Sequence, residues 1–547
     1  MKSNHNLNLD FAHNPNRNPY PTPRLPQYAN RGMVATSQPL AAQAGLAILQ
    51  QGGNAVDAAI ATAACLTVVE PTSNGIGGDA FAIVWMKGEM HGLNSSGPAP
   101  MAISIDKVRG LGHETMPKTG WLPVTVPGAP AAWAALSERF GALTLAQCLA
   151  PAIDYAKNGH AVSPVVARGW QGAYRGYSRH EGAEFAAWGD TFAPNGKTPR
   201  AGEIWTSPDH AATLAEIGAT NAKSFYSGRL ADEIAAFSAK TGGLLAKSDL
   251  EAFKPEWVTP ISANYRGYDV WELPPNGQGL VALIALNVLN GFEFADHQKD
   301  CPAAYHKAFE AVKLAFTAGK EFITDPAAMQ ISVDELLSEK YAATLRNMIG
   351  QTAIEPVAIK PNGGGTVYLA TADGDGNMVS FIQSNYMGFG SGIVVPNTGI
   401  ALQNRGADFS LNPDHANALA PGKRTYHTII PAFLTKGGTA VGPFGVMGGY
   451  MQPQGHVQVV MNTIDFGLNP QAALDAPRWQ WMAGKQFDIE HNFPRHAAQD
   501  LAAMGHVLRP ALDTGGFGRG QIIWRDPVTG VLCGGTESRC DGHLAAW

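Results

Sequence analysis

The stretch GGGTVYLATA, residues 363–372, decides how the rest of the chain is interpreted. Three glycines, which allow backbone conformations that side chains forbid, lead directly into apolar and β-branched residues typical of a buried strand. A second run of this kind covers residues 378–384, and the intervening DGDGN has the composition of a hairpin turn. The pattern therefore predicts a β-hairpin whose first strand opens on Thr366.

Thr366 is the candidate nucleophile. Amide hydrolysis needs a hydroxyl and a nearby base, and a threonine at a new amino terminus supplies both, because its own α-amine can take the hydroxyl proton. Attack on the Gly365 carbonyl would form an ester, and hydrolysis of that ester would free the amine. Gly365 offers little steric hindrance to this attack. The alternative interpretation is a glycine-rich loop that simply enters a strand beginning with threonine.

The sequence on either side divides into two parts. Residues 38–69 are rich in alanine with apolar residues at helical spacing, interrupted at Gly52-Gly53, which predicts a helical hairpin. Residues 79–86 have the pattern of a buried strand, and residues 280–289 that of a core helix too short to cross a bilayer. Helical patterns dominate up to about residue 348. Residues 1–30 are polar and rich in proline, and are predicted to be a flexible arm.

Composition excludes several classes of function. The chain has 547 residues, 45% of them apolar, and a formal charge of −6 without a dense Lys/Arg run, which favours a small-molecule partner over nucleic acid. Its 5 cysteines are scattered, and neither a tight metal-ligand set nor a dinucleotide fingerprint is found, so no metal or cofactor is expected. With no secretory signal or membrane span visible, a cytoplasmic location is expected.

Longer stretches resemble one family. Residues 29–85, ANRGMVATSQPLAAQAGLAILQQGGNAVDAAIATAACLTVVEPTSNGIGGDAFAIVW, are similar to the opening helices and Gly-Gly-Asp strand of the γ-glutamyltransferases. The stretches DGDGNMVSF (373–381), GFGSGIVVPNTGIALQN (388–404) and APGKRTYHTIIPA (420–432) follow in the family's order, as does VMGGYMQPQGHVQVVMNTIDFGLNPQAALDAPRW (446–479). The resemblance covers nearly the whole chain from residue 29.

The resemblance implies an α/β (α+β) fold, a four-layer αββα sandwich of the N-terminal nucleophile hydrolase type. It also implies autoproteolysis between Gly365 and Thr366, giving an α-chain (31–365) and a β-chain (366–547) that stay together as a heterodimer and could dimerise further. Ser384 matches the second hydroxyl beside the nucleophile. Gly448 and Gly449 match the pair whose backbone N–H groups form the oxyanion hole.

The substrate-binding positions depart from the transferases. Ser96 stands where the transferases use an arginine to bind the donor's α-carboxylate, and a hydroxyl cannot replace that charged fork. His427 and Thr428 replace two serines that touch the same carboxylate, and Tyr386 replaces an asparagine near the nucleophile. We therefore expect a smaller pocket, in which γ-glutamyl transfer is in doubt.

A different cation is present instead. Arg405 replaces a neutral residue beside the substrate, and is predicted to anchor a substrate carboxylate with His427 as a second donor. Asp408 matches the residue that holds the α-ammonium group of a glutamyl donor, and a simple Arg405–Asp408 pair is the alternative interpretation.

These positions resemble the branch of the family that includes oxamate amidohydrolase, an enzyme of purine-nitrogen salvage. The leading hypothesis is therefore hydrolysis of a small carboxylate-bearing amide, with oxamate giving oxalate and ammonia. A γ-glutamyl hydrolase or transferase, or a side-chain acylase, is the enzymatic alternative. An uncleaved scaffold protein without catalytic activity is the alternative of another class.

Overall fold

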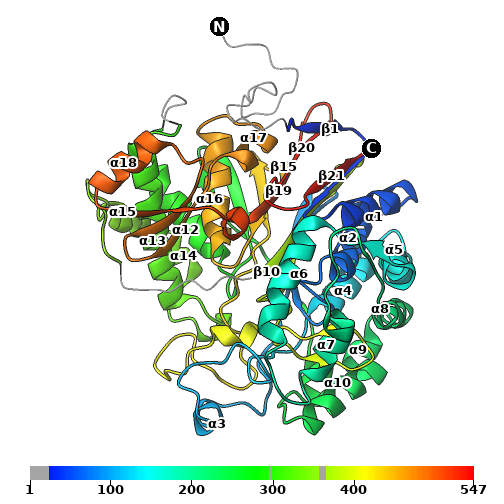
Figure 1. Ribbon diagram of the computed structural model, residues 1–547. Coiled ribbons are helices and arrows are strands. Elements are labelled where there is room, and N and C mark those ends of the chain that lie inside the picture. Colours follow the sequence, from blue (N-terminus) through cyan, green and yellow to red (C-terminus); the bar gives the residue numbers. More distant parts are fainter. Residues whose placement is uncertain (1–23, 295–298, 357–364) are drawn as a thin grey trace.

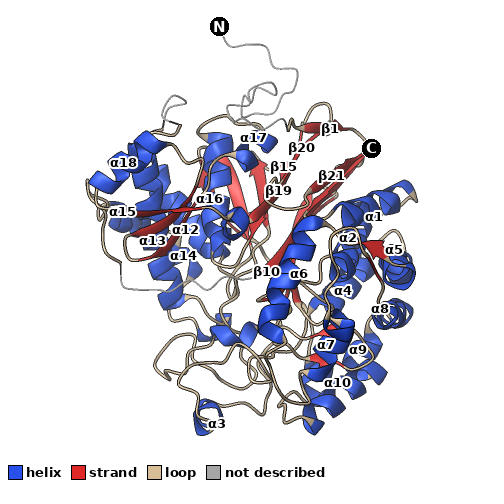
Figure 2. Ribbon diagram, in the orientation of Figure 1, coloured by secondary structure: helices blue, strands red, loops and turns tan. Residues whose placement is uncertain are grey.

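The computed structural model describes residues 24–294, 299–356 and 365–547. Two antiparallel sheets lie face to face, and a layer of helices covers the outer side of each (Figures 1 and 2). The predicted four-layer αββα sandwich is therefore confirmed. Strands β10 and β11 of one sheet contact β15 of the other, so the two sheets share an apolar interior that includes Phe81, Tyr368, Ile382 and Met447.

The first sheet carries the predicted hairpin at its centre. Its strands, in spatial order, are β21 (His543–Ala546), β2 (Gly32–Thr36), β10 (Gly365–Asp373), β11 (Met378–Tyr386), β3 (Asp79–Met86), β4 (Glu89–Ser95) and β7 (Glu256–Val258). Asp373 closes the turn by accepting hydrogen bonds from the backbone N–H groups of Asp375 and Asn377, each at 3.0 Å. The hairpin and the strand over 79–86 agree with the sequence pattern.

The second sheet faces the first. Its strands, in spatial order, are β1 (Gln27–Ala29), β20 (Leu532–Thr536), β19 (Arg519–Arg525), β15 (Thr439–Met447), β14 (Ala432–Lys436), β9 (Tyr268–Glu272) and β8 (Ile261–Tyr265). Strand β1 corrects the predicted arm of residues 1–30, because Gln27–Ala29 pairs with β20 and is part of the sheet. Residues 1–23 of that arm lie outside the described residues.

Helices before residue 253 form the layer on the first sheet. Helices α1, α2 and α4 contact its strands, and α5 and α8 pack on α2. The helices of this half are α1 (Pro39–Gln50), α2 (Ala55–Val69), α3 (Ile105–Gly110), α4 (Ala129–Phe140), α5 (Leu145–Asn158), α6 (Pro164–Tyr177), α7 (Ala186–Phe192), α8 (Pro208–Thr220), α9 (Lys223–Ser227), α10 (Arg229–Lys240) and α11 (Lys247–Ala252). Helices α1 and α2 are the predicted hairpin, and they pack so closely that a side chain at Gly45 would collide with Thr62.

The later helices cover the second sheet. Helices α12, α16 and α17 contact its strands, and α13, α15 and α18 pack around α12 and α13. They are α12 (Gly279–Asn290), α13 (Pro302–Phe322), α14 (Val333–Leu336), α15 (Glu339–Arg346), α16 (Met451–Ile464), α17 (Pro470–Asp475) and α18 (Arg495–Ala503). Helix α12 is the predicted core helix. Among the described residues, no helix has both the length and the apolar character to span a membrane.

Short elements complete the fold. Two-stranded pairs are formed by β5 (His160–Ala161) with β6 (Ile204–Trp205) and by β12 (Val394–Val395) with β13 (Ile400–Ala401). A small sheet contains β16 (Trp479–Ala483), β17 (Gln486–Glu490) and β18 (Val507–Ala511). The 3₁₀ turns are η1 (Pro194–Gly196), η3 (Pro326–Ala328), η4 (Arg405–Asp408) and η5 (Thr514–Phe517).

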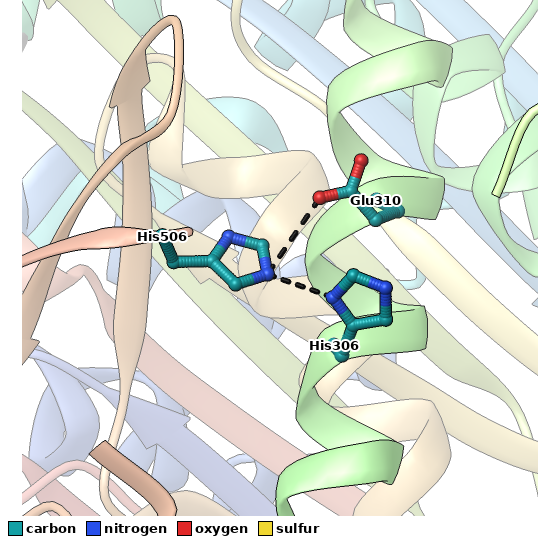
Figure 3. A group of neighbouring side chains, drawn as sticks. All are labelled: His306, Glu310 and His506. Atoms are coloured by element: carbon teal, nitrogen blue, oxygen red, sulfur yellow. Dashed lines mark hydrogen bonds and ion pairs between the residues drawn. The ribbon is translucent and has the colours of Figure 1, made fainter. Parts of the chain in front are cut away.

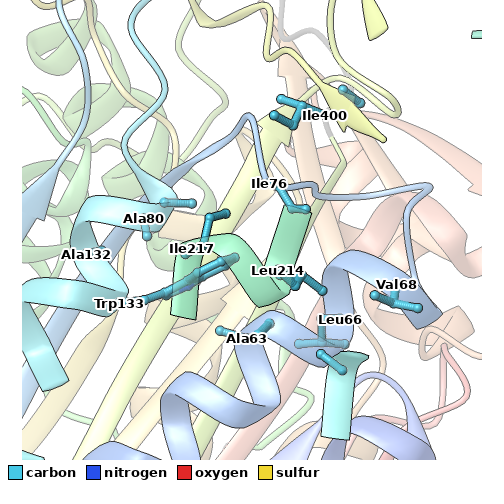
Figure 4. Packing of buried hydrophobic residues seen from close by; sticks show 14 of the residues in the cluster. Ala63, Leu66, Val68, Ile76, Ala80, Ala132, Trp133, Leu214, Ile217 and Ile400 are labelled. Carbon is cyan, nitrogen blue, oxygen red and sulfur yellow. The ribbon is translucent and has the colours of Figure 1, made fainter. Parts of the chain in front are cut away.

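The core on the first sheet fixes β11. Figure 4 shows Leu66 of α2, Trp133 of α4 and Leu214 of α8 packed together. The Trp133 indole donates a hydrogen bond to Gln383 Oε1 at 2.9 Å, and Gln383 Nε2 donates to Asn74 Oδ1 at 2.7 Å. Buried polar groups of this kind specify a unique arrangement when their partners are all present. These two hydrogen bonds therefore fix Gln383, the residue that precedes Ser384 in β11.

Candidate active site

Thr366 lies at the start of β10 with its side chain fully buried. The ladder between β10 and β11 is irregular there, because Gly365 is opposite Tyr386 whereas Val367 is opposite Gln383. A bulge of this kind redirects a side chain. It brings the Thr366 hydroxyl to 3.0 Å from the Ser384 hydroxyl.

Ser384 connects the candidate nucleophile to the carbonyl before it. Its hydroxyl donates to the Gly365 carbonyl at 2.7 Å and accepts from the Tyr386 N–H at 2.8 Å. A serine hydroxyl has one hydrogen, so the bond between the two hydroxyls must run from Thr366 Oγ1 to Ser384 Oγ. Ser384 thus accepts from the nucleophile while it polarises the carbonyl that the nucleophile would attack.

Gly448 and Gly449 follow β15 and precede α16. Both have a positive φ, 139° and 59°, which favours glycine. Gln278 Nε2 donates to the Gly449 carbonyl at 2.8 Å and to the Thr428 carbonyl at 2.6 Å, and so fixes the loop. Gly448 and Gly365 line the same cleft.

Arg405 is fully buried and packs on the ring of Tyr386. Its guanidinium carbon is 3.9 Å from the centre of the Tyr386 ring, and its side chain is buried. Nη1 donates to Thr428 Oγ1 at 2.7 Å and lies 3.5 Å from Asp408 Oδ2. Nε and Nη2 have no hydrogen-bond partner among the described residues. The Arg405–Asp408 pair weighed above is therefore present, but it leaves one edge of the guanidinium unused.

Asp408 accepts hydrogen bonds from two tyrosines. The Tyr386 hydroxyl donates to its Oδ1 at 2.7 Å and the Tyr450 hydroxyl at 2.9 Å. Tyr450 also contacts Lys320, whose ammonium lies 3.7 Å from the centre of the Tyr450 ring. Burial lowers the pKa of Lys320 to about 8, and the charge of Asp408 opposes that shift. Both tyrosines bind Oδ1, whereas Oδ2 has no hydrogen-bond partner among the described residues and lies beside the Arg405 guanidinium.

His427 does not have the predicted role. Its Nδ1 accepts from the Ile429 N–H at 3.3 Å, so its Nε2 donates to Asp79 Oδ2 at 3.0 Å. Burial lowers the pKa of this imidazole well below its usual value, and burial raises the pKa of Asp79 to about 7. With both ring nitrogens occupied, His427 cannot serve as a second donor to a substrate carboxylate. Its role is to fix the strand-end Asp79.

Ser96 is held by two asparagines and has no hydrogen bond to Arg405 among the described residues. Its hydroxyl donates to Asn94 Oδ1 at 2.7 Å and accepts from Asn276 Nδ2 at 3.3 Å. Direct contacts therefore group Tyr386, Arg405, Asp408 and Thr428 in one buried cluster, and the Tyr386 N–H connects this cluster to Ser384. Lys320 and Gln278 were missed, because no local motif distinguishes a buried lysine or glutamine in an otherwise apolar helical region.

A cleft of about 490 Å³ gives access to the site. Its lining is mainly glycine, methionine and short polar side chains: Thr72, Ser73, Val165, Val166, Gly169, Gly365, Met387, Gly388, Met447, Gly448, Gln480, Met482, Asp488, Gly515, Gly516 and Arg519. The cleft reaches both Gly365 and Gly448, between which the reacting carbonyl would lie.

The sequence analysis also did not predict a buried cluster of two histidines and a glutamate. His306 and Glu310 of α13 meet His506, which precedes β18 (Figure 3). His306 Nδ1 and His506 Nε2 are 2.8 Å apart, and His506 Nε2 lies 3.7 Å from Glu310 Oε1. The expectation of no tight ligand set therefore needs revision, since these are residue types that bind metals. However, Lys313 Nζ lies 2.7 Å from Glu310 Oε1, where its charge opposes a bound cation.

The same cluster fixes the end of the helical half. Lys313 donates to the Ile354 carbonyl at 2.7 Å, and His306 Nε2 bonds to the Gly350 carbonyl at 3.0 Å. We expect Lys313→Met to destabilise the protein by about 3–5 kcal/mol, because it removes the cation that lies 2.7 Å from the buried Glu310 carboxylate. The shift in the urea unfolding midpoint measures this. The double variant E310L/K313M should recover most of the loss, and an unchanged midpoint in the single variant would contradict a structural ion pair.

A threonine opening a central strand of an αββα sandwich, with a hydroxyl partner and a glycine pair across a cleft, defines the class of N-terminal nucleophile hydrolases. The chain belongs to the gamma-glutamyltranspeptidase family, whose model matches residues 41–547.

The proteins to which this chain is similar are described with different activities. A glutathione hydrolase-like proenzyme from Bacillus subtilis is 37% identical over 519 residues, which cover 93% of this chain and 97% of the relative. An oxamate amidohydrolase proenzyme from Klebsiella pneumoniae is 33% identical over 534 residues, covering 95% and 99%. A crystal structure described as cephalosporin acylase from Bacillus halodurans has 62% identity and a TM-score of 0.94, covering 98% of this chain and 99% of that chain. Family membership thus gives hydrolytic chemistry on amides, with the substrate still to be assigned.

Proposed function

We propose that the protein is an autoprocessing amidohydrolase that uses Thr366 as an amino-terminal nucleophile on a small carboxylate-bearing amide, with oxamate as the leading substrate. The observation that carries this proposal is the position of the Ser384 hydroxyl, bonded to both Thr366 Oγ1 and the Gly365 carbonyl. We propose cleavage between these two residues, giving an α-chain and a β-chain that remain associated.

The catalytic cycle follows from the same groups. After cleavage, the Thr366 α-amine takes the hydroxyl proton while Oγ1 attacks the amide carbon and forms an ester. Donors aimed at the developing oxyanion stabilise this step, and the N–H groups of the Gly448–Gly449 loop are our candidates. The amine leaves with a proton as the C–N bond breaks, and water then hydrolyses the ester to release the carboxylic acid.

The unpaired donors of Arg405 favour a substrate that bears a carboxylate. A buried guanidinium without partners at Nε and Nη2 offers two parallel donors, the geometry that binds a carboxylate in bidentate fashion. Asp408 accepts hydrogen bonds from Tyr386 and Tyr450 at Oδ1, and its Oδ2 lies 3.5 Å from the Arg405 cation, whose charge disfavours the α-ammonium group of a γ-glutamyl donor. These contacts favour an amide with a carboxylate and no neighbouring amine, as in oxamate.

A side-chain acylase is the second candidate. The cleft of about 490 Å³ exceeds what oxamate fills, and the solved structure with 62% identity is described as a cephalosporin acylase. The test is to incubate the processed protein with oxamate, a γ-glutamyl anilide and a glutaryl amide of a cephalosporin nucleus. Release of ammonia from oxamate supports the leading substrate. Rapid hydrolysis of the γ-glutamyl anilide without ammonia from oxamate would reject it.

Ser384→Ala should slow self-cleavage by about 10²–10³-fold, because removing one donor that polarises a reacting carbonyl has effects of this size. The fraction of uncut chain, followed over hours by intact mass, measures the rate. Ser384→Thr retains the hydroxyl and should cleave at nearly the original rate. Equal rates for the alanine and threonine variants would rule out this role.

A further inference from the structure

Lys320 is a charged residue close to the reaction centre that the proposed catalytic cycle does not use. It lies in the last turn of α13, and its ammonium nitrogen is 3.7 Å from the centre of the Tyr450 ring and 4.2 Å from that of the Tyr426 ring. We propose that Lys320 is a positioning residue, whose ammonium group holds the Gly448–Gly449 loop in the conformation that receives the oxyanion. The inference rests on the proposed function, because it assumes that this loop acts in turnover at Thr366.

Two routes lead from Lys320 to this loop. Tyr450 follows Gly449 directly and precedes the first turn of α16, so the backbone joins its side chain to the loop. The Tyr426 hydroxyl donates to Gln278 Oε1 at 3.0 Å, and Gln278 Nε2 donates to the Gly449 carbonyl at 2.8 Å. An ammonium group over the faces of two aromatic rings is attracted to both. Lys320 therefore holds the loop through the side chain of Tyr450 and through the carbonyl of Gly449.

The charge of Lys320 also sets the direction of a hydrogen bond. Its Nζ donates to the Tyr450 hydroxyl, and this hydroxyl donates to Asp408 Oδ1 at 2.9 Å. A charged ammonium group has no lone pair, so the single hydroxyl hydrogen of Tyr450 goes to Asp408. A neutral amine has a lone pair that competes for this hydrogen. Loss of the Lys320 proton therefore weakens both the ring contacts and the bond from Tyr450 to Asp408.

The groups around Lys320 allow it to lose this proton at mildly alkaline pH. Among the described residues, no carboxylate lies in ion-pair contact with its ammonium group. Burial lowers the pKa of Lys320 to about 8, while the Asp408 carboxylate opposes this shift and the Arg405 guanidinium adds to it. His415 also faces Lys320 and is uncharged at that pH, because burial lowers its pKa and the Lys320 charge adds to this shift. Both tyrosines stay protonated, since burial raises their pKa values well above the usual range.

The first test is the pH dependence of kcat for the unmodified protein, which should fall with an apparent pKa of about 8 as Lys320 loses its proton. The profile is taken with whichever of the three amides named above the processed protein hydrolyses, so it does not depend on oxamate. The Thr366 amine has the opposite dependence, because it must be neutral to accept the hydroxyl proton. A kcat that stays level or still rises from about pH 8 to about pH 10 would overturn the proposal.

Two substitutions identify the titrating group. Lys320→Met should lower kcat by about 10–100-fold with little change in KM, because a small displacement of groups around the reacting atoms has effects of this size. It should also abolish the alkaline fall. Lys320→Arg keeps a cation that does not titrate in this range, so it should retain most of kcat and lose the alkaline fall. Lys436→Met is the matched control, since it removes a lysine 4.5 Å from the centre of the Tyr268 ring, and it should leave kcat and the profile unchanged.

The outcomes separate this role from the proposed function. An alkaline fall that persists in Lys320→Arg, or an unchanged kcat in Lys320→Met, would reject the role of Lys320 while turnover at Thr366 stands. Hydrolysis of the glutaryl amide alone would reject oxamate and leave the role of Lys320 supported by the same profiles. No hydrolysis of any of the three amides by the processed protein would reject the proposed function, and this role with it. If Lys320→Met does not fold, the arginine variant and the profile of the unmodified protein decide.

Discussion

Thr366→Ala should yield a single uncut chain of about 57.8 kDa with no measurable amidase activity. The substitution removes the hydroxyl that forms the ester in both self-cleavage and turnover, and no neighbouring group can replace an amino-terminal nucleophile. The unmodified protein should instead give two masses, of 365 and 547 − 365 = 182 residues, which together exceed the precursor by one water. Intact mass measurement of freshly purified protein distinguishes these outcomes.

The matched control for this variant is Thr366→Ser, which keeps the hydroxyl and should still cleave. Two chains from Thr366→Ala, or a stable uncut chain from the unmodified protein, would contradict self-cleavage at this position. The second outcome would favour the uncleaved scaffold.

Arg405→Met should lower kcat/KM for a carboxylate-bearing amide by about 10²–10³-fold. Truncating one partner of a buried charged hydrogen-bonded pair costs about 2–5 kcal/mol, and each 1.4 kcal/mol is a factor of about ten. Arg405→Lys retains the charge but loses the planar fork, so a smaller loss is expected. Initial rates over a range of substrate concentrations give KM and kcat separately, and the main effect should be on KM.

Self-cleavage serves as the folding control for Arg405→Met, because the Ser384 contacts with Thr366 and Gly365 do not involve Arg405. A processed variant with activity within threefold of the unmodified protein would show that Arg405 does not bind the substrate. In that case the Arg405–Asp408 contact would be structural only.

Local patterns predicted the elements that contain the candidate nucleophile, because strand and turn residues are adjacent in sequence. The hairpin of β10 and β11 and the strand from Asp79 to Met86 were found in this way. The bulge at Thr366 was not predictable, since it depends on pairing across the sheet. His427 was misinterpreted for a similar reason, because its partner Asp79 is 348 residues away and a hydrogen bond at that separation leaves no local pattern.

The order of strands has a consequence for how the protein can be made. In the first sheet, β2 of the N-terminal half lies between β21 and β10 of the C-terminal half, and β11 is followed by β3. The second sheet likewise has β1 at one edge and β9 and β8 at the other, with C-terminal strands between them. A split gene that encodes residues 1–365 and 366–547 separately would produce halves whose sheets both lack members. We therefore expect the uncut chain to assemble more readily than the two separate halves, and the proposed cleavage to follow assembly.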